Sequence, residues 1–230
     1  MSEQLARLES ALGYRFRDSR LLQRALTHRS RGAENYERLE FLGDGLLNFL
    51  IGEALYEVRP LAEEGDLSRL RASLVREQSL ARIAAGLELG DALQLGPGEL
   101  KSGGFRRDSI LADALEAVLG AVYLDGGFPA ARQACLQIFA PMLQALPEAA
   151  TLKDAKTRLQ EALQGHGRPL PEYVVLSQEG PPHRQMFTAA CRLRDGGQQT
   201  EATGASRKQA EQLAAERMLE LLTVLEKGPP

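Results

Sequence analysis

Residues 37–50 read Glu-Arg-Leu-Glu-Phe-Leu-Gly-Asp-Gly-Leu-Leu-Asn-Phe-Leu, a pattern that predicts a helix with one acidic side. At about 100° per residue, Glu37, Glu40 and Asp44 fall within about 60° of arc. The opposite side carries apolar residues that we expect to pack into a core, namely Leu39, Leu42, Leu46, Phe49 and Leu50. Crowded carboxylates repel one another unless a positive charge lies between them. The stretch is therefore either the solvated face of an amphipathic helix or part of a cation site.

A second acidic stretch repeats this arrangement. Residues 110–124 have helical spacing, with Asp113 and Glu116 three positions apart on one face together with Gly120. The other side carries the apolar residues Leu111, Leu115, Val118, Leu119 and Val122. The repeat suggests that the two acidic faces belong to one site.

Four carboxylates, those of Glu40, Asp44, Asp113 and Glu116, would converge if the two helices packed side by side. A hard divalent cation would relieve their repulsion. Oxygen ligands without cysteine or paired histidine favour magnesium or manganese over zinc. Such ions bind phosphates and can activate a water for in-line attack on a phosphodiester. Carboxylate-rich helices also serve isoprenoid diphosphate enzymes and di-iron proteins, but the Glu-x-x-His motif of di-iron sites is absent from the sequence.

Length and composition indicate a globular protein of one large or two modest domains. The 230 residues are 43% hydrophobic and 26% charged. No stretch approaches about 18 uninterrupted apolar residues, and the first twelve positions lack a signal pattern, so we expect no membrane span, no export and a cytoplasmic location. Cys135 and Cys191 have no metal-ligand spacing and are expected to be buried thiols.

The pattern changes near residue 147. Residues 1–147 show helical patterns without a convincing strand and predict an all-α domain, which a short linker at 148–153 follows. Residues 154–226 predict a small α+β domain of order α-β-β-β-α, with a three-stranded antiparallel sheet and both helices on one face. Residues 1–150 carry 17 basic and 21 acidic side chains, a net charge of −4, whereas residues 151–230 carry 11 and 10, a net charge of +1. The second part can still bind a polyanion where its basic groups cluster.

Phe41 lies off the leucine side of the first acidic helix. It shares a side with Gly45 and Gly52, about 40° from Glu37, so we expect another surface to dock closely there. That surface belongs either to the same chain or to a second copy in a self-complementary dimer.

The stretch from Glu37 to Asp44, Glu-Arg-Leu-Glu-Phe-Leu-Gly-Asp, resembles the signature of bacterial ribonuclease III. Further blocks match in family order: Leu26-Thr27-His28-Arg29-Ser30, Glu64-Gly65-Asp66-Leu67-Ser68, Leu95-Gly96-Pro97-Gly98-Glu99-Leu100-Lys101-Ser102-Gly103-Gly104 and Ile110-Leu111-Ala112-Asp113-Ala114-Leu115-Glu116-Ala117. The resemblance covers nearly the whole chain. It implies an all-helical endonuclease domain, a homodimer with one cutting site per subunit, and magnesium-dependent hydrolysis of double-stranded RNA, with manganese as a substitute. The products would carry 5′-phosphate and 3′-hydroxyl ends with short 3′ overhangs.

The same resemblance implies roles for individual residues. The metal ligands match Glu40, Asp113 and Glu116, and the catalytic pair matches Asp44 and Glu116. Supporting acids match Glu37 and Glu64, and Phe41 matches an aromatic residue that packs into the partner subunit. Tyr36 and Gly45-Leu46 depart from the commonest family pattern, but they lie beside the acids without replacing any.

The C-terminal part resembles a double-stranded RNA-binding domain, whose last helix meets phosphates across the A-form major groove. In this chain Arg207 and Lys208 open that helix, where fixed charges and the helix dipole would face a phosphate together. The resemblance implies further contacts, to the flanking minor grooves, from Thr157, Gln160, Glu161 and His183. A basic residue usual after the alanine is replaced by Glu211, so we expect modest affinity.

These patterns predict a homodimeric double-stranded-RNA endonuclease that processes ribosomal and other structured RNA precursors without a small-molecule cofactor. One alternative is a protein that binds duplex RNA without cutting it, and the presence of all four metal-site acids speaks against it. An isoprenoid diphosphate enzyme would leave the C-terminal module unexplained.

Overall fold

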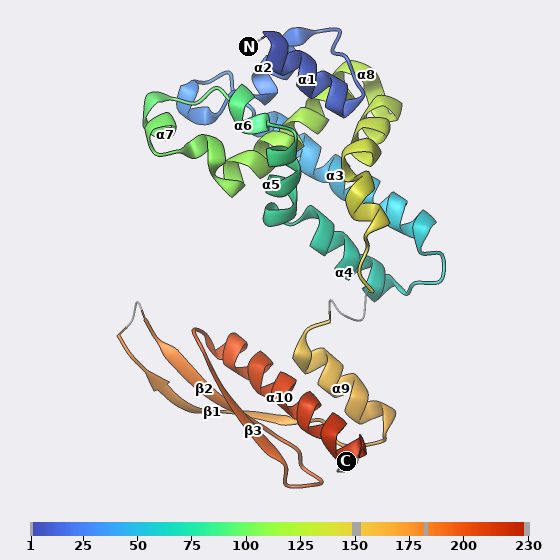
Figure 1. Ribbon diagram of the computed structural model, residues 1–230, viewed down its shortest axis with the longest axis vertical. Coiled ribbons are helices and arrows are strands. Elements are labelled where there is room, and N and C mark those ends of the chain that lie inside the picture. The colour runs from blue at the N-terminus through green and yellow to red at the C-terminus, as the bar shows by residue number, and fades with distance from the viewer. Residues whose placement is uncertain (1, 149–152, 182–183, 228–230) are drawn as a thin grey trace. The chain divides into compact units, whose positions relative to one another are not determined.

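The computed structural model describes residues 2–148, 153–181 and 184–227. The chain divides into two compact units, Met1–Leu152 and Lys153–Pro230, each with its own hydrophobic core. None of the helices in the described residues is long and apolar enough to cross a bilayer. Both units are drawn in Figure 1.

In the described residues of the first unit, all regular secondary structure is helical except one isolated bridge between Thr27 and Gln94. Its α-helices are α1 (Ser2–Leu12), α2 (Ser19–Ala25), α3 (Glu37–Val58), α4 (Glu64–Val75), α5 (Glu77–Gly86), α6 (Leu89–Ala92), α7 (Pro97–Lys101) and α8 (Asp108–Gln144), with short 3₁₀ turns at Arg29–Arg31 and Gly104–Arg106. Within α8 the backbone breaks at Gly127, whose φ of 78° suits glycine. The predicted all-α fold is therefore confirmed.

Helices α3 and α8 cross at two glycines that allow their backbones to touch. A Cβ added to Gly43 would lie 1.8 Å from the carbonyl oxygen of Glu116, and one added to Gly120 would lie 2.4 Å from that of Leu39. Neither position can therefore hold a larger residue without pushing the helices apart. This contact places the acidic flank of α3 beside the acidic flank of α8.

The crossing also corrects the predicted core face of α3. Phe49 was expected in the core, but its side chain is 58% exposed and meets only the Phe128 ring edge-on, at 5.8 Å between centroids, among the described aromatic pairs. Of the other predicted core residues, Leu39 and Leu50 are buried, and Leu42 and Leu46 are half-buried. The buried residues of α3 also include Gly43, Leu47, Ile51, Ala54 and Leu55. The buried face of α3 is therefore rotated away from the predicted one. The reason is that α3 packs against α8 through Gly43 and not through a large side chain such as Phe49.

The second unit has the predicted order α-β-β-β-α. It consists of α9 (Ala155–Gly165), β1 (Glu172–Glu179), β2 (Met186–Arg192), β3 (Gln199–Gly204) and α10 (Arg207–Lys227). The strands form an antiparallel sheet of order β1-β2-β3, and both helices lie on one face of it (Figure 1). Asp154 caps α9 by accepting the Thr157 backbone N–H at 2.9 Å. The core between sheet and helices includes Leu159, Leu163, Cys191, Ala214 and Met218.

Candidate functional site

Three carboxylates meet where α3 and α8 cross. Glu40 comes from α3, and Asp113 and Glu116 come from α8. One oxygen from each lies within 4.8 Å of the other two, and all three side chains are half-buried. Three of the four carboxylates that the two acidic stretches predict to converge therefore meet here, and Asp44 is not among them.

The electrostatics of this cluster favour a bound cation. Burial, followed by the charges of Asp44, Asp113 and Glu40, raises the pKa of Glu116 to about 8. Burial and neighbouring carboxylates also raise the pKa of Glu40 and of Asp113. All donors are hard oxygens, and a divalent cation would satisfy their charge at once, so the residues fit a magnesium-type ion.

The other predicted acids lie around the cluster rather than in it. Asp44 is exposed, one turn along α3, and accepts a hydrogen bond from the Asn48 side-chain amide at 2.8 Å. Glu37 lies 3.6 Å from Arg29 at the outer edge. Glu64 begins α4, where it accepts a hydrogen bond from the Ser68 hydroxyl at 2.8 Å and lines a separate groove. Within one chain, the structure therefore does not bring Glu64 into the cluster.

A polar pocket of about 200 Å³ opens beside the cluster. Its lining residues are His28, Arg29, Tyr36, Glu37, Glu40, Glu99, Arg107, Ser109, Ile110 and Asp113. Sequence reasoning did not assign site roles to Tyr36, Glu99, Arg107 or Ser109. Two sequence signals lie near them, the family block from Leu95 to Gly104 and the glycine pair that ends it, but neither indicates a contact between Glu99 and Arg107.

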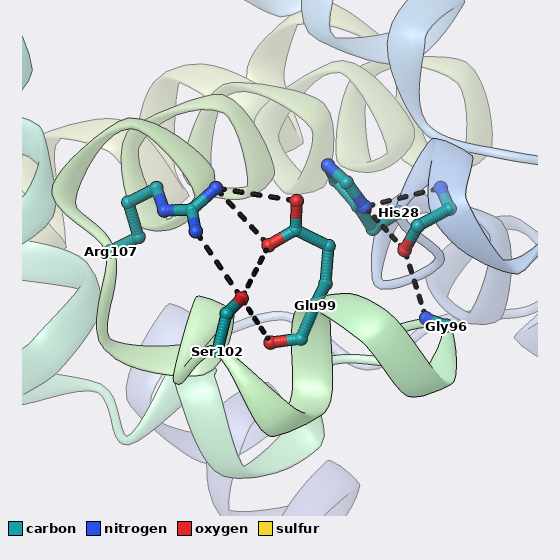
Figure 2. A network of polar contacts seen from close by, with 6 residues as sticks. His28, Gly96, Glu99, Ser102 and Arg107 are labelled. Carbon is teal, nitrogen blue, oxygen red and sulfur yellow. Dashed lines mark hydrogen bonds and ion pairs between the residues drawn. The ribbon is translucent and has the colours of Figure 1, made fainter.

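His28 is buried and forms hydrogen bonds that hold two segments together. Its Nδ1 lies 2.7 Å from the Ser30 hydroxyl and accepts the Ser30 backbone N–H at 3.2 Å. The Ser30 hydroxyl oxygen in turn accepts the Gly96 N–H at 2.9 Å (Figure 2). These bonds tie the segment before α3 to the segment before α7 and shape one wall of the pocket.

Glu99 and Arg107 form the opposite wall. Arg107 reaches the Glu99 carboxylate at 3.1 Å, and the Ser102 hydroxyl lies between them as a shared partner (Figure 2). A Cβ on Gly104 would lie 2.9 Å from a Glu99 carboxylate oxygen, so the second glycine of the pair makes room for Glu99. Gly103, with φ of 78°, supplies the turn.

Phe41 is 83% exposed and makes no ring-to-ring contact with a described aromatic residue. It borders an apolar groove of about 510 Å³ that also contains Leu46, Phe49, Tyr123 and Phe128. Nothing lies within 4 Å of a Cβ added to Gly45 beside it. The described chain therefore leaves this apolar surface uncovered.

Five of the predicted RNA-binding residues of the second unit lie on its helices, three on α9 and two at the start of α10. Gln160 and Glu161 are exposed and Thr157 is half-buried on α9, where Glu161 accepts from the Lys153 ammonium at 2.8 Å. His183 lies outside the described residues. Lys208 is exposed in the first turn of α10.

Arg207, predicted to face a phosphate, forms an ion pair with Glu211. The Arg207 Nε donates to a Glu211 carboxylate oxygen at 2.8 Å, and the Lys156 ammonium donates to the other oxygen at 2.8 Å. Glu211, noted from sequence only as a missing basic residue, is therefore paired with two cations.

Comparison with known proteins identifies both units. Residues 18–143 match the family described as Ribonuclease-III-like, and residues 155–222 match the Double-stranded RNA binding motif. The chain is 57% identical over 215 residues to Ribonuclease 3 of Alkalilimnicola ehrlichii, covering 94% of each chain. It is 53% identical over 224 residues to Ribonuclease 3 of Pseudomonas aeruginosa, strain LESB58, covering 97% of this chain and 98% of the relative.

A solved structure supports the same assignment for the first unit. The nuclease domain of ribonuclease III from Campylobacter jejuni is 46% identical, with a TM-score of 0.57, over 59% of this chain and 95% of that domain. That structure is described as showing structural flexibility in a region involved in dimer formation. The acidic cluster, the RNA-binding fold and these relatives together show that the chain belongs to the ribonuclease III family of metal-dependent endonucleases specific for double-stranded RNA.

Proposed function

We propose that the chain is a magnesium-dependent homodimer that cuts double-stranded RNA at the cluster of Glu40, Asp113 and Glu116. The observation that carries this proposal is the approach of three carboxylate oxygens within 4.8 Å of one another, in a setting that raises the pKa of Glu116 to about 8. Manganese would substitute because it has similar oxygen preferences.

Glu40, Asp113 and Glu116 hold the metal. When bound, the ion supplies a Lewis acid for the phosphodiester and lowers the pKa of a coordinated water. Asp44, one helical turn along α3 and hydrogen-bonded to the Asn48 amide, would orient the attacking water and take up its proton. Glu116 would act together with Asp44 as the second member of the catalytic pair. Glu37 and Glu64 would support the site from outside the cluster.

The RNA-binding unit positions the duplex. Lys208 and Arg207 at the start of α10 would contact phosphates across the major groove, and Thr157, Gln160 and Glu161 on α9 would face a minor groove. His183 would contact the second minor groove. This unit would comprise residues 154–226, joined through residues 148–153 to a nuclease domain of residues 1–147.

Two active sites in a homodimer would cut both strands and leave 5′-phosphate and 3′-hydroxyl ends with short 3′ overhangs. Ribosomal and other structured RNA precursors in the cytoplasm are the proposed substrates. The exposed Phe41 and its apolar groove support the dimer, because a large uncovered apolar surface marks an interaction site. If Phe41→Ala sediments like the wild type, or the wild type is itself a monomer, this role of Phe41 is wrong.

Cleavage of long duplex RNA, with and without magnesium, tests the proposal. The wild type should cut only with metal, and Glu116→Gln should retain RNA binding but lose about a thousandfold or more of the cleavage rate. Glu57→Gln on α3 is the matched control, because its exposed carboxylate lies outside the polar pocket and its partner Arg132 keeps a second carboxylate, Glu53. Binding without metal-dependent cleavage by the wild type would contradict the enzyme assignment and favour a non-cleaving RNA-binding protein.

A further inference from the structure

Glu211 joins the two helices of the RNA-binding unit through a three-residue ion network. Its side chain lies one turn into α10, four residues after Arg207, and the residue is only 7% exposed. Arg207 donates to one carboxylate oxygen and Lys156, from α9, donates to the other, each at 2.8 Å. Both oxygens of the carboxylate are therefore used by cations of the protein itself.

The network holds Glu211 ionised and Lys156 in place. Burial alone would raise the pKa of Glu211, but the hydrogen bonds from Arg207 and Lys156 outweigh burial and lower it. The Lys156 ammonium also lies 4.1 Å from the centre of the Tyr173 ring, a favourable cation–π position. The Lys156 ammonium is thus held between the Glu211 carboxylate and the Tyr173 ring.

The neighbouring basic residues are held to different degrees. Arg207 uses its Nε for Glu211, although 67% of its side chain is exposed. Lys208 is exposed and makes no hydrogen bond or ion pair among the described residues. Among Lys156, Arg207 and Lys208, the Lys208 side chain is therefore the least restrained.

We propose that Glu211 is a residue that limits affinity for double-stranded RNA. Its carboxylate neutralises one charge at the phosphate-facing start of α10 and withholds Lys156 and part of Arg207 from the duplex. This inference rests on the proposed RNA-binding role of Arg207 and Lys208. An enzyme that must release two cut ends gains turnover when each contact to the phosphate backbone is weak.

The number of phosphates contacted can be measured directly. Each contact releases condensed counterions, so the logarithm of the association constant falls with the logarithm of salt concentration, with a slope of about −0.9 per phosphate for duplex DNA, which we take as the guide for RNA. A residue with only a structural role would change stability without changing this slope. The slope therefore distinguishes a charge-limiting role for Glu211 from a structural one.

The experiment uses the full-length protein and a duplex RNA of about 20 base pairs, longer than the ~16 that such a domain spans. A chelator prevents cleavage while binding is titrated at several salt concentrations. Glu211→Gln should bind about fivefold more tightly near 0.1 M salt, with a slope steeper by about 0.9. Unchanged or weaker binding by a folded Glu211→Gln protein, at an unchanged slope, would overturn the inference.

Glu216→Gln is the matched control. Glu216 also lies on α10 and pairs with a cation of α9, Arg158, at 3.1 Å. Its replacement makes the same change in net charge but lies five residues further along the helix. Glu216 lies eight residues beyond Lys208, about 12 Å along the helix at about 1.5 Å per residue. We expect the slope of this variant to equal that of the wild type, because exposed charges separated by more than a Debye length of about 10 Å are largely screened.

Single alanine substitutions cover the case in which Glu211→Gln fails to fold. In the wild-type background, Lys208→Ala should weaken RNA binding several-fold more than Arg207→Ala, because Arg207 is already engaged. Equal losses would overturn the inference. If Lys208→Ala leaves binding unchanged, the proposed RNA surface itself is wrong, whereas a loss with Lys208→Ala but no gain with Glu211→Gln refutes only the role of Glu211.

Discussion

Glu116 in the nuclease unit and Glu211 in the RNA-binding unit are both sheltered carboxylates, but the pKa shifts of the two run in opposite directions. Glu116 has three further carboxylates around it, and its pKa rises to about 8. Glu211 has Lys156 and Arg207 on its two oxygens, and its pKa falls. Burial by itself would raise the pKa of both carboxyl groups. The direction of each net pKa shift is therefore decided by the charge of the neighbouring side chains. A carboxylate left without a protein cation can accept a metal, whereas a neutralised one cannot.

The largest expected effect comes from removing the contact that creates the cluster. Gly43→Ala should destabilise the protein by more than about 3 kcal/mol and abolish cleavage, because the new methyl group would overlap the Glu116 backbone. Denaturant unfolding and a cleavage assay would measure both. Gly52→Ala on the same helix is the control, because its Cβ would meet nothing closer than 3.9 Å. A fully stable and active Gly43→Ala protein would contradict the close crossing of α3 and α8.

Neutralising Glu116 should stabilise the metal-free protein at high pH. The folded-state pKa of about 8 exceeds the ordinary value of 4.5, so the associated stability is present below pH 4.5 and is lost as pH rises through 8. Relative to wild type, Glu116→Gln should gain about 2 kcal/mol above pH 8, a value discounted for partial solvation, and nothing below pH 4.5. Denaturant titrations in chelator at several pH values test this difference.

With magnesium present, the wild type should become more stable than Glu116→Gln. A metal that binds only the folded wild type stabilises it by mass action, and Glu116→Gln lacks a ligand. Wild type should therefore show a rise in Tm with added magnesium that the variant lacks. Equal shifts for both proteins would place the metal elsewhere.

Neutralising Glu211 should have the opposite pH dependence. Its folded-state pKa is below the ordinary 4.5, so its stabilising contribution is present above that pH and is lost as pH falls through the lowered value. Glu211→Gln should cost about 1–2 kcal/mol at neutral pH, less than a fully buried pair because Arg207 is solvated. The difference from wild type should shrink in acid. A constant difference across the pH range would show that packing, and not charge, is responsible.

The smallest effect should come from the outermost acid of α3. Glu37 is paired with Arg29 and lies outside the three-oxygen cluster, so Glu37→Gln should slow cleavage only several-fold, about 1 kcal/mol in the barrier. Glu40→Gln, which removes a proposed ligand, should slow it at least a hundredfold. Similar losses for both variants would mean that Glu37 also touches the metal or the substrate.

Helical period and family resemblance were sufficient to predict the two acidic helices and the α-β-β-β-α unit. Glu40, Asp113 and Glu116 meet as that pattern requires, because a period of 3.6 residues specifies which side chains share a face. The helical period could not identify which other helix packs against each side of α3. Phe49 was expected in the core, although α3 packs through Gly43 and leaves Phe49 exposed.

The sequence by itself determined the chemistry of this protein: carboxylates for a divalent metal, and a basic helix start for phosphate. Only the tertiary structure decided which carboxylates have a positively charged side chain beside them and which do not. It left Glu116 among acids, paired Glu211 with Lys156 and Arg207, and placed Glu99 and Arg107 on the pocket wall. The physical reason is that a charge acts on whatever lies within a few ångströms. Side chains 55 residues apart, such as Lys156 and Glu211, become neighbours only when the helices pack.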